Sequence, residues 1–191
     1  TNAEDGSLKG TGRSIPGVNL HSLFENCGDV FLRFGGHSGA CGFSLKPECL
    51  SEFRSKMQEL VEAQVKENPD LLTEHLEIEK ELAEYEKTIA YAEAVKKLEP
   101  FGEGNPVPVF CMRNALVSNF FTMGSDGQHL RFVATTADGI PVSCVLFGKA
   151  KKYTDFMRNG ACVDVAGELE VNEFRGERKI QIRIRDIKLS K

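Results

Sequence analysis

Residues 163–189, VDVAGELEVNEFRGERKIQIRIRDIKL, decide the fold of the second half of the chain. Apolar and polar residues alternate over 163–171 and again over 180–184, which is the pattern of two strands buried on one face. The apolar phase then slips by one position, which predicts a β-bulge near residues 185–186. We therefore expect a β-hairpin whose loop spans residues 172–177.

The sequence before this hairpin predicts three more strands, at 109–119, 129–136 and 141–147. Turn-forming residues such as those at 125–127 separate them. A helix is expected at 149–157. Three strands, one helix and two strands are the element order of an OB-fold, a five-stranded β-barrel.

In an OB-fold, the connections between strands 1 and 2 and between strands 4 and 5 frame a cleft for oligonucleotides. Here these connections are residues 120–128 and 172–177. Both contain aromatic residues that can stack on bases, namely Phe120, Phe121 and Phe174.

The basic face of the last strand has two interpretations. Lys179, Arg183 and Arg185 alternate with apolar residues, so they share one face and can follow a phosphodiester backbone. They can instead form ion pairs with acidic residues of the preceding strand. Those residues are Asp164, Glu168 and Glu170. Both interpretations can hold, because a barrel strand has two neighbours.

The first part of the chain predicts helices and strands in alternation. Asn19 can cap a short helix, and strands are expected at 31–37 and 42–45. Pro47 starts a longer helix with a buried apolar stripe. The acidic segment 71–98 predicts a strand and then a helix that stops at a proline.

The chain is accordingly expected to be α+β, with a first domain over 1–70, a connector over 71–99 and the barrel over 100–191. A net charge of -4 over 191 residues argues against a strongly basic nucleic-acid clamp. The charge is uneven, however. Residues 1–100 hold 11 basic and 18 acidic residues, and residues 101–191 hold 13 and 10, so an anionic partner favours the second half.

Composition excludes several other classes. No apolar run reaches the ~18 residues of a membrane helix, and the first residues are unlike a signal peptide, which predicts a cytoplasmic protein without membrane contact. The six cysteines form no pair at metal or redox spacing. We therefore expect reduced thiols and no metal site.

Two glycine-containing stretches offer phosphate-binding chemistry. In residues 10–14, the glycines allow close backbone approach, Thr11 and Ser14 offer hydroxyl groups and Arg13 offers a charged fork. The sequence Gly35-Gly36-His37 can place an imidazole against a phosphate. The alternatives are an ordinary loop for the first stretch and a turn histidine with a local hydrogen bond for the second.

Three motifs together carry a family resemblance. They are TGRSIPG at 11–17, LRFGGH at 32–37 and LEPFGEGNP at 98–106. Their order resembles the C-terminal half of the RecJ-type nucleases of the DHH phosphoesterase superfamily. The resemblance implies a DHHA1 domain, truncated at its N-terminus, followed by a nucleic-acid-binding OB domain.

The resemblance also implies site residues. The family motif that contacts the DNA backbone and the 5′-phosphate falls on Thr11, Arg13 and Ser14, with Thr11 where the family usually has serine. Gly35, Gly36 and His37 would face the catalytic cleft, with His37 in an accessory catalytic role. The barrel residues expected to bind the strand are Phe120, Phe121, His129, Arg131, Phe174, Arg175, Lys179 and Arg183.

The resemblance further implies a 5′-to-3′ exonuclease acting on single-stranded DNA in repair and recombination. Such enzymes use Mn²⁺ or Mg²⁺ held by an Asp-His-His cluster. No two of the four histidines are adjacent, so we expect a substrate-binding fragment that is inactive alone and holds no cofactor. Expected partners are single-stranded DNA, a single-strand-binding protein and a helicase.

Two alternatives stay open. The barrel can be a module that docks a single-strand-binding protein, with nucleic acid secondary. The chain can instead belong to a DHH-family phosphoesterase that acts on short RNA.

Overall fold

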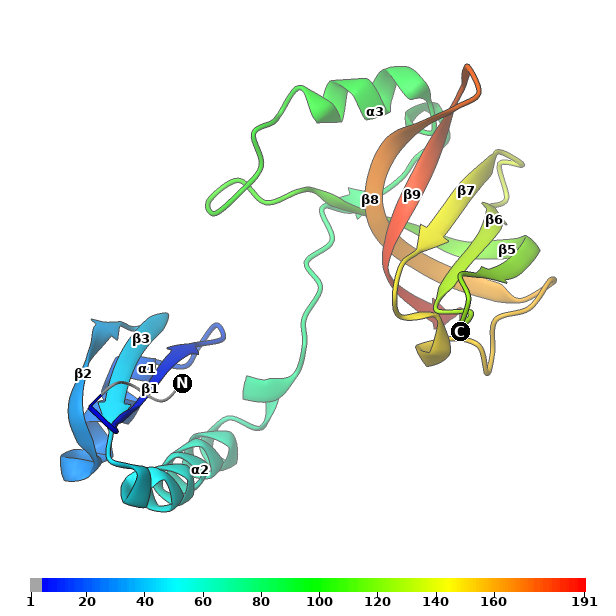
Figure 1. The fold of residues 1–191 in the computed structure, drawn as a ribbon. Helices are drawn as coiled ribbons and strands as arrows, with labels where there is room; N and C mark the ends of the chain where they lie inside the picture. Colours follow the sequence, from blue (N-terminus) through cyan, green and yellow to red (C-terminus); the bar gives the residue numbers. More distant parts are fainter. Residues whose placement is uncertain (1–4) are drawn as a thin grey trace. The chain divides into compact units, whose positions relative to one another are not determined.

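A computed structural model describes residues 5–191 of the chain. It divides into two compact units, Thr1–His75 and Leu76–Lys191. Each unit has its own sheet (Figure 1). The α+β class that the sequence predicts is confirmed.

The first unit is built on a three-stranded antiparallel sheet of order β1-β3-β2. The strands are β1 (Leu8–Arg13), β2 (Phe31–His37) and β3 (Ala40–Leu45). The alternative interpretation of residues 10–14 as an ordinary loop is wrong for 10–13, because β1 continues to Arg13. Glycine is suited to this strand at Gly10, because the Phe43 ring packs directly on the backbone there. A Cβ at Gly10 would come within 2.4 Å of the ring.

Two helices accompany this sheet, α1 (Leu20–Asn26) and α2 (Leu50–Glu67). The predicted cap of α1 is confirmed, since the Asn19 side chain accepts a hydrogen bond from the Ser22 backbone N–H. Phe24 is buried among other phenylalanine rings at centroid distances of 4.9–6.0 Å. The apolar stripe predicted to be buried on α2 is only half-buried. No residue of that helix is fully buried.

The second unit is a closed barrel of five strands. Its order is β5-β6-β7-β9-β8, and a β5–β8 pairing closes it. All pairings are antiparallel except β7 with β9, which are parallel. The strands are β5 (Val109–Met123), β6 (His129–Thr135), β7 (Pro141–Leu146), β8 (Cys162–Phe174) and β9 (Glu177–Leu189). The OB-fold expectation is confirmed.

The inward-facing residues of these strands fill the barrel. Leu130, Phe132, Cys144 and Ile182 are all fully buried. The predicted bulge is confirmed. Ala166 pairs with Asp186 and Gly167 with Ile184, which leaves Arg185 as the extra residue.

Other element predictions need correction. The expected helix at 149–157 is a single 3-10 turn over Ala150–Lys152, because Tyr153 turns inward to the core and donates a hydrogen bond to Asp186. The strand expected in the first part of the segment 71–98 is reduced to β4 (Lys80–Glu81), which pairs with β5. The helix that follows is α3 (Ile89–Lys96), which contacts β8 and β9.

A partly buried ion pair joins the segment before α3 to the β6–β7 hairpin. Lys87 Nζ donates to Asp138 Oδ2 and to Thr136 Oγ1. The Lys87 side chain is 1% exposed and that of Asp138 is 15% exposed. Burial raises the pKa of Asp138, but hydrogen bonds from Lys87, Ile140 and Thr136 outweigh it, so that pKa lies below its ordinary value.

Candidate nucleic-acid interface

The barrel carries an aromatic and basic row on its outer surface. Phe121 pairs with Arg131, Arg131 with Val145, and Val145 with Arg183. Residues in register on neighbouring strands point to the same face, so this row crosses β5, β6, β7 and β9. We call it the barrel row. It brings together three residues that the sequence predicted.

Phe121 reaches the row through a bulge in β5. The prediction that Phe120 and Phe121 belong to a loop is wrong, since β5 extends to Met123. Asn119 has a φ of 52°, and Asn119 and Phe120 are opposed by one residue only, Phe132. The bulge leaves Phe120 packed against the barrel core and Phe121 48% exposed.

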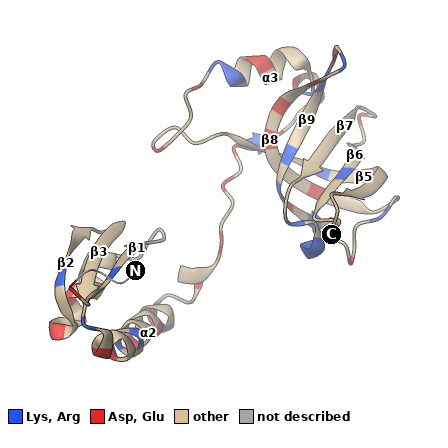
Figure 2. Cartoon of the chain, viewed as in Figure 1, with Lys and Arg blue, Asp and Glu red and all other residues tan. Residues whose placement is uncertain are grey.

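The two arginines of the barrel row differ from nearby cations in whether they form ion pairs. Within residues 5–191, Arg131 and Arg183 form no ion pair. The Arg183 guanidinium lies 6.0 Å from the Phe147 ring centroid. By contrast, Arg185 pairs with Glu168 and Lys179 with Glu177. The ion-pair interpretation of the basic strand therefore holds for Arg185, whose partner Glu168 lies on β8. Lys179 pairs within its own strand. Lysines and arginines are blue in Figure 2.

His129 has a local structural contact. Its Nδ1 accepts a hydrogen bond from the Gly148 N–H at 2.9 Å, and its ring packs on Phe147 at 5.4 Å between centroids. Phe147 is 53% exposed. The Phe147 ring contacts both Arg183 and His129. The sequence analysis did not select Phe147 as a site residue. Its position directly after an apolar strand was the signal that could have found it.

The β8–β9 hairpin is tighter than expected. Its turn is Arg175-Gly176, and Phe174 ends β8, so the predicted loop over 172–177 is mostly strand. Arg175 has a φ of 52°, and its guanidinium lies 5.2 Å from the Phe174 ring centroid. The tip therefore presents an exposed ring beside a cation.

A hollow of about 650 Å³ lies beside the barrel row. Phe121, Arg131 and Lys179 line it together with Asn119 and Ser143, which the sequence interpretation did not single out. Those two residues come from β5 and β7. Only the strand register brings them together, and no local motif marks them.

The first unit presents a second face, which we call the glycine face. Thr11 and Gly35 both pair with Gly42, and Arg13 and His37 both pair with Ala40. Because residues 40 and 42 lie two apart on β3, these two rows share one side of the sheet. A Cβ at Gly35 would meet nothing within 4 Å, so the centre of this face is open.

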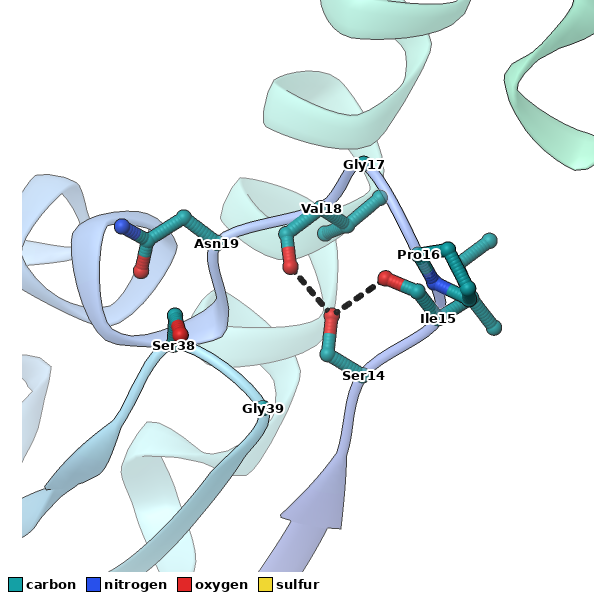
Figure 3. A pocket seen from close by; sticks show the side chains of 8 residues that line it. All are labelled: Ser14, Ile15, Pro16, Gly17, Val18, Asn19, Ser38 and Gly39. Carbon is teal, nitrogen blue, oxygen red and sulfur yellow. Dashed lines mark hydrogen bonds between the residues drawn. The ribbon is translucent and has the colours of Figure 1, made fainter. Parts of the chain in front are cut away.

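Gly36 and Ser14 lie elsewhere. Gly36 pairs with Cys41, which is buried on the opposite side of the sheet. The Ser14 hydroxyl is turned toward its own loop, where Oγ is 2.6 Å from Val18 O and 3.3 Å from Ile15 O (Figure 3). That loop borders a shallow hollow of about 490 Å³. The structure therefore does not bring these two residues onto the glycine face.

His37 has the local contact that the alternative interpretation expected. Its Nδ1 accepts a hydrogen bond from the Gly39 N–H at 3.2 Å. This bond fixes the ring and leaves Nε2 as the nitrogen that can face a ligand.

The cysteines are free thiols. Burial raises the pKa of Cys27, Cys111 and Cys144, while Cys162 is exposed. Over residues 5–191, no group of three or more His, Cys, Asp or Glu side chains is placed to hold a metal ion. None of the helices in this described part is long and apolar enough to cross a membrane.

The fold and its two faces define a chain that combines a small α+β domain with an OB-fold barrel. Residues 78–186 match the family model described as the RecJ OB domain, and residues 1–63 match the DHHA1 domain. The chain belongs to the RecJ family.

Curated relatives agree with this assignment. The single-stranded-DNA-specific exonuclease RecJ of Salmonella typhimurium is 32% identical over 192 residues, which cover 97% of this chain and 32% of the relative. The RecJ of Bacillus subtilis is 28% identical over 187 residues, covering 98% of this chain and 23% of the relative. The chain thus spans between 23% and 32% of the length of these relatives.

A solved structure has the same fold. The crystal structure of RecJ from Thermus thermophilus in complex with Mg²⁺ matches with a TM-score of 0.68 and 25% sequence identity. The match covers 96% of this chain and 27% of that one.

Proposed function

We propose that the chain is the DHHA1 and OB part of an exonuclease that degrades single-stranded DNA from its 5′ end, and that it grips the strand. The barrel row carries the proposal. It combines an exposed ring with two arginines that have no ion-pair partner in the described chain. Aromatic rings stack on unpaired bases of any sequence, and arginines neutralise phosphates.

The barrel row would take successive nucleotides across the strands. Arg131 and Arg183 would contact phosphates while Phe121 stacks on a base. The hairpin tip, with Phe174 and Arg175, would hold the strand further along. His129 would act by supporting Phe147, because its Nδ1 is already engaged.

The glycine face would approach the 5′ end of the strand. Arg13 and Thr11 would contact a backbone or terminal phosphate, and the open surface at Gly35 would let the strand come close to the sheet. His37 would stabilise charge near the reacting phosphate as an accessory group. Ser14 and Gly36 would shape the neighbouring backbone.

The hydrolytic chemistry would lie outside these residues. The Mn²⁺ or Mg²⁺ implied by the family resemblance would supply water activation and charge stabilisation there. The residues described here offer no cluster that fits such ions, so we propose that the isolated chain binds DNA without cutting it. We retain the division into a first domain over 1–70, a connector over 71–99 and a barrel over 100–191 as a proposal about domain organisation.

The cellular setting is part of the same proposal. The chain would act in the cytoplasm in DNA repair and recombination. A single-strand-binding protein and a helicase would be its partners, since both present or generate single strands.

The test compares the wild-type chain with an Arg131→Ala plus Arg183→Ala double variant. Binding of single-stranded DNA is measured by fluorescence anisotropy over a range of salt concentrations. We expect wild-type affinity of about micromolar strength. The slope of log affinity against log salt should fall by about 1.4 in the double variant, because about 0.7 is lost per phosphate contact on single strands. Arg185→Ala is the matched control, since Arg185 already pairs with Glu168.

An unchanged salt slope in the double variant would show that the barrel row does not bind DNA. In that case, binding of an acidic peptide to the double variant and to the Arg185→Ala control would favour the protein-docking alternative.

A further inference from the structure

The hollow beside the barrel row has the lining of a pocket for a flat, partly polar ring. Six apolar residues line it: Ile89, Phe121, Phe132, Val133, Pro141 and Ile180. Asn119 and Ser143 add polar groups, and Arg131 and Lys179 add positive charge. A volume of about 650 Å³ lies within the range of small-molecule sites.

The β5 wall of the hollow is held by a contact from a distant segment. The Phe120 N–H donates to Asn159 Oδ1 at 2.9 Å, and the Gly160 N–H donates to Val117 O at 2.8 Å. These bonds anchor the bulge on both sides. Phe121, which follows the bulge, is therefore positioned before any ligand arrives.

The lining of the hollow also includes the buried Lys87. Because the Lys87 ammonium is bound to Asp138 and Thr136, Lys87 lines the hollow without offering it a free charge. The cations available to a ligand are then Arg131, which has no ion pair in the described residues, and Lys179. The Lys179 side chain is 74% exposed in its pair with Glu177, and such a pair is weak.

One further observation points to a ligand with polar edges. Ser143 Oγ is buried and has no hydrogen-bond partner among the described residues. Buried polar groups are nearly always paired. A nucleobase carries donors and acceptors on its edge and can supply the partner, whereas an aliphatic ligand cannot.

We propose that this hollow takes a single nucleobase, turned out of the strand, with the adjoining phosphate held by Arg131 and Lys179. The inference rests on the proposed function and extends it from surface stacking to a discrete base pocket. Since serine and asparagine can donate to or accept from any base edge, the pocket would have little sequence preference. The same chemistry also fits a free mononucleotide.

The strand form of the proposal is tested with the 191-residue chain and an oligothymidylate of about twelve nucleotides. A single abasic residue is moved along the oligonucleotide. Stacking on one aromatic ring corresponds to a loss of about tenfold. We expect that loss at one position of the oligonucleotide.

Phe121→Ala should bind the intact oligonucleotide about tenfold more weakly and lose nothing more when the abasic residue occupies that position. Phe121→Trp keeps a ring and should retain the abasic penalty. Tyr85→Ala is the matched control, because Tyr85 is an aromatic residue of the same unit, 75% exposed, and does not line the hollow.

The mononucleotide form is tested by saturation transfer from the protein to thymidine monophosphate in solution. If the wild-type chain transfers saturation to thymidine monophosphate and Phe121→Ala does not, the hollow binds free nucleotides. If the abasic profile is flat and thymidine monophosphate shows no transfer, the base pocket is overturned, although salt-sensitive DNA binding would leave the proposed function intact. If the intact oligonucleotide does not bind at all, the proposed function fails.

Discussion

At the residue scale, the two glycines of the LRFGGH motif have different roles. Gly35 lies on the open glycine face, while Gly36 has a φ of 150°, and a Cβ there would lie 2.1 Å from the Ala40 carbonyl oxygen. Only glycine fits at Gly36. Chemically identical neighbours in a motif therefore differ: the backbone requires glycine at Gly36, whereas Gly35 has open space around it.

This difference gives a direct prediction. Gly36→Ala should destabilise the first unit by about 2 kcal/mol or more, because the added methyl group overlaps backbone and φ is strained. Gly35→Ala is the matched control and should leave the unfolding temperature nearly unchanged, because nothing lies within 4 Å of its Cβ. Thermal unfolding followed by circular dichroism measures both. Equal destabilisation by the two variants would contradict the register described here.

At the element scale, the Lys87–Asp138 pair joins the segment before α3 to the β6–β7 hairpin. The buried Lys87 ammonium depends on its partly exposed partner Asp138, because removing that carboxylate leaves a buried charge without compensation. Lys87 also lines the hollow. Its loss should therefore affect both the stability of the second unit and the shape of the binding surface.

Lys87→Met should lower the free energy of unfolding by about 1 to 3 kcal/mol, because hydrogen bonds to a charged group are lost, as measured by urea denaturation. The pKa of Asp138 is below its ordinary value of 3.8 in the folded chain. Its contribution to stability is therefore present above that value and disappears as the pH falls through the lower, folded-state pKa.

Asp138→Asn should remove this part of the acid dependence. An unfolding free energy that falls equally steeply with acid in wild type and in Asp138→Asn would show that other carboxylates are responsible. Glu177→Gln is a suitable control, because Glu177 lies in an exposed pair.

At the scale of the whole molecule, the chain has two separate cores. The first is small and aromatic, centred on Phe24, and the second is the larger barrel core around Phe132. A small core buries less apolar surface and is less stable. We expect two calorimetric transitions, with the first unit unfolding at the lower temperature.

Phe24→Ala and Phe132→Ala form a matched pair for this prediction. Each should cost about 3 to 5 kcal/mol, and each should shift only the transition of its own unit. A single cooperative transition that both variants shift would contradict the division into two units.

Local patterns predicted much of the second unit. The alternation over 163–171 and 180–184 predicted β8 and β9, and the phase slip predicted the bulge at Arg185. These features depend on side-chain periodicity, which is a property of neighbouring residues. The helix expected at 149–157 failed because Tyr153 is held by a contact with the distant Asp186, which no local pattern contains.

The sequence by itself determined the OB-fold order of elements, the basic character of the last strand and the family motifs. Only the tertiary structure decided which arginines are neutralised, since Arg185 and Arg183 differ by their partners across the barrel and not by their type. It also decided that Phe121 faces outward while Gly36 and Ser14 do not reach the glycine face. The physical reason is that strand register and bulges set the direction of each side chain, and both depend on residues far apart in the chain.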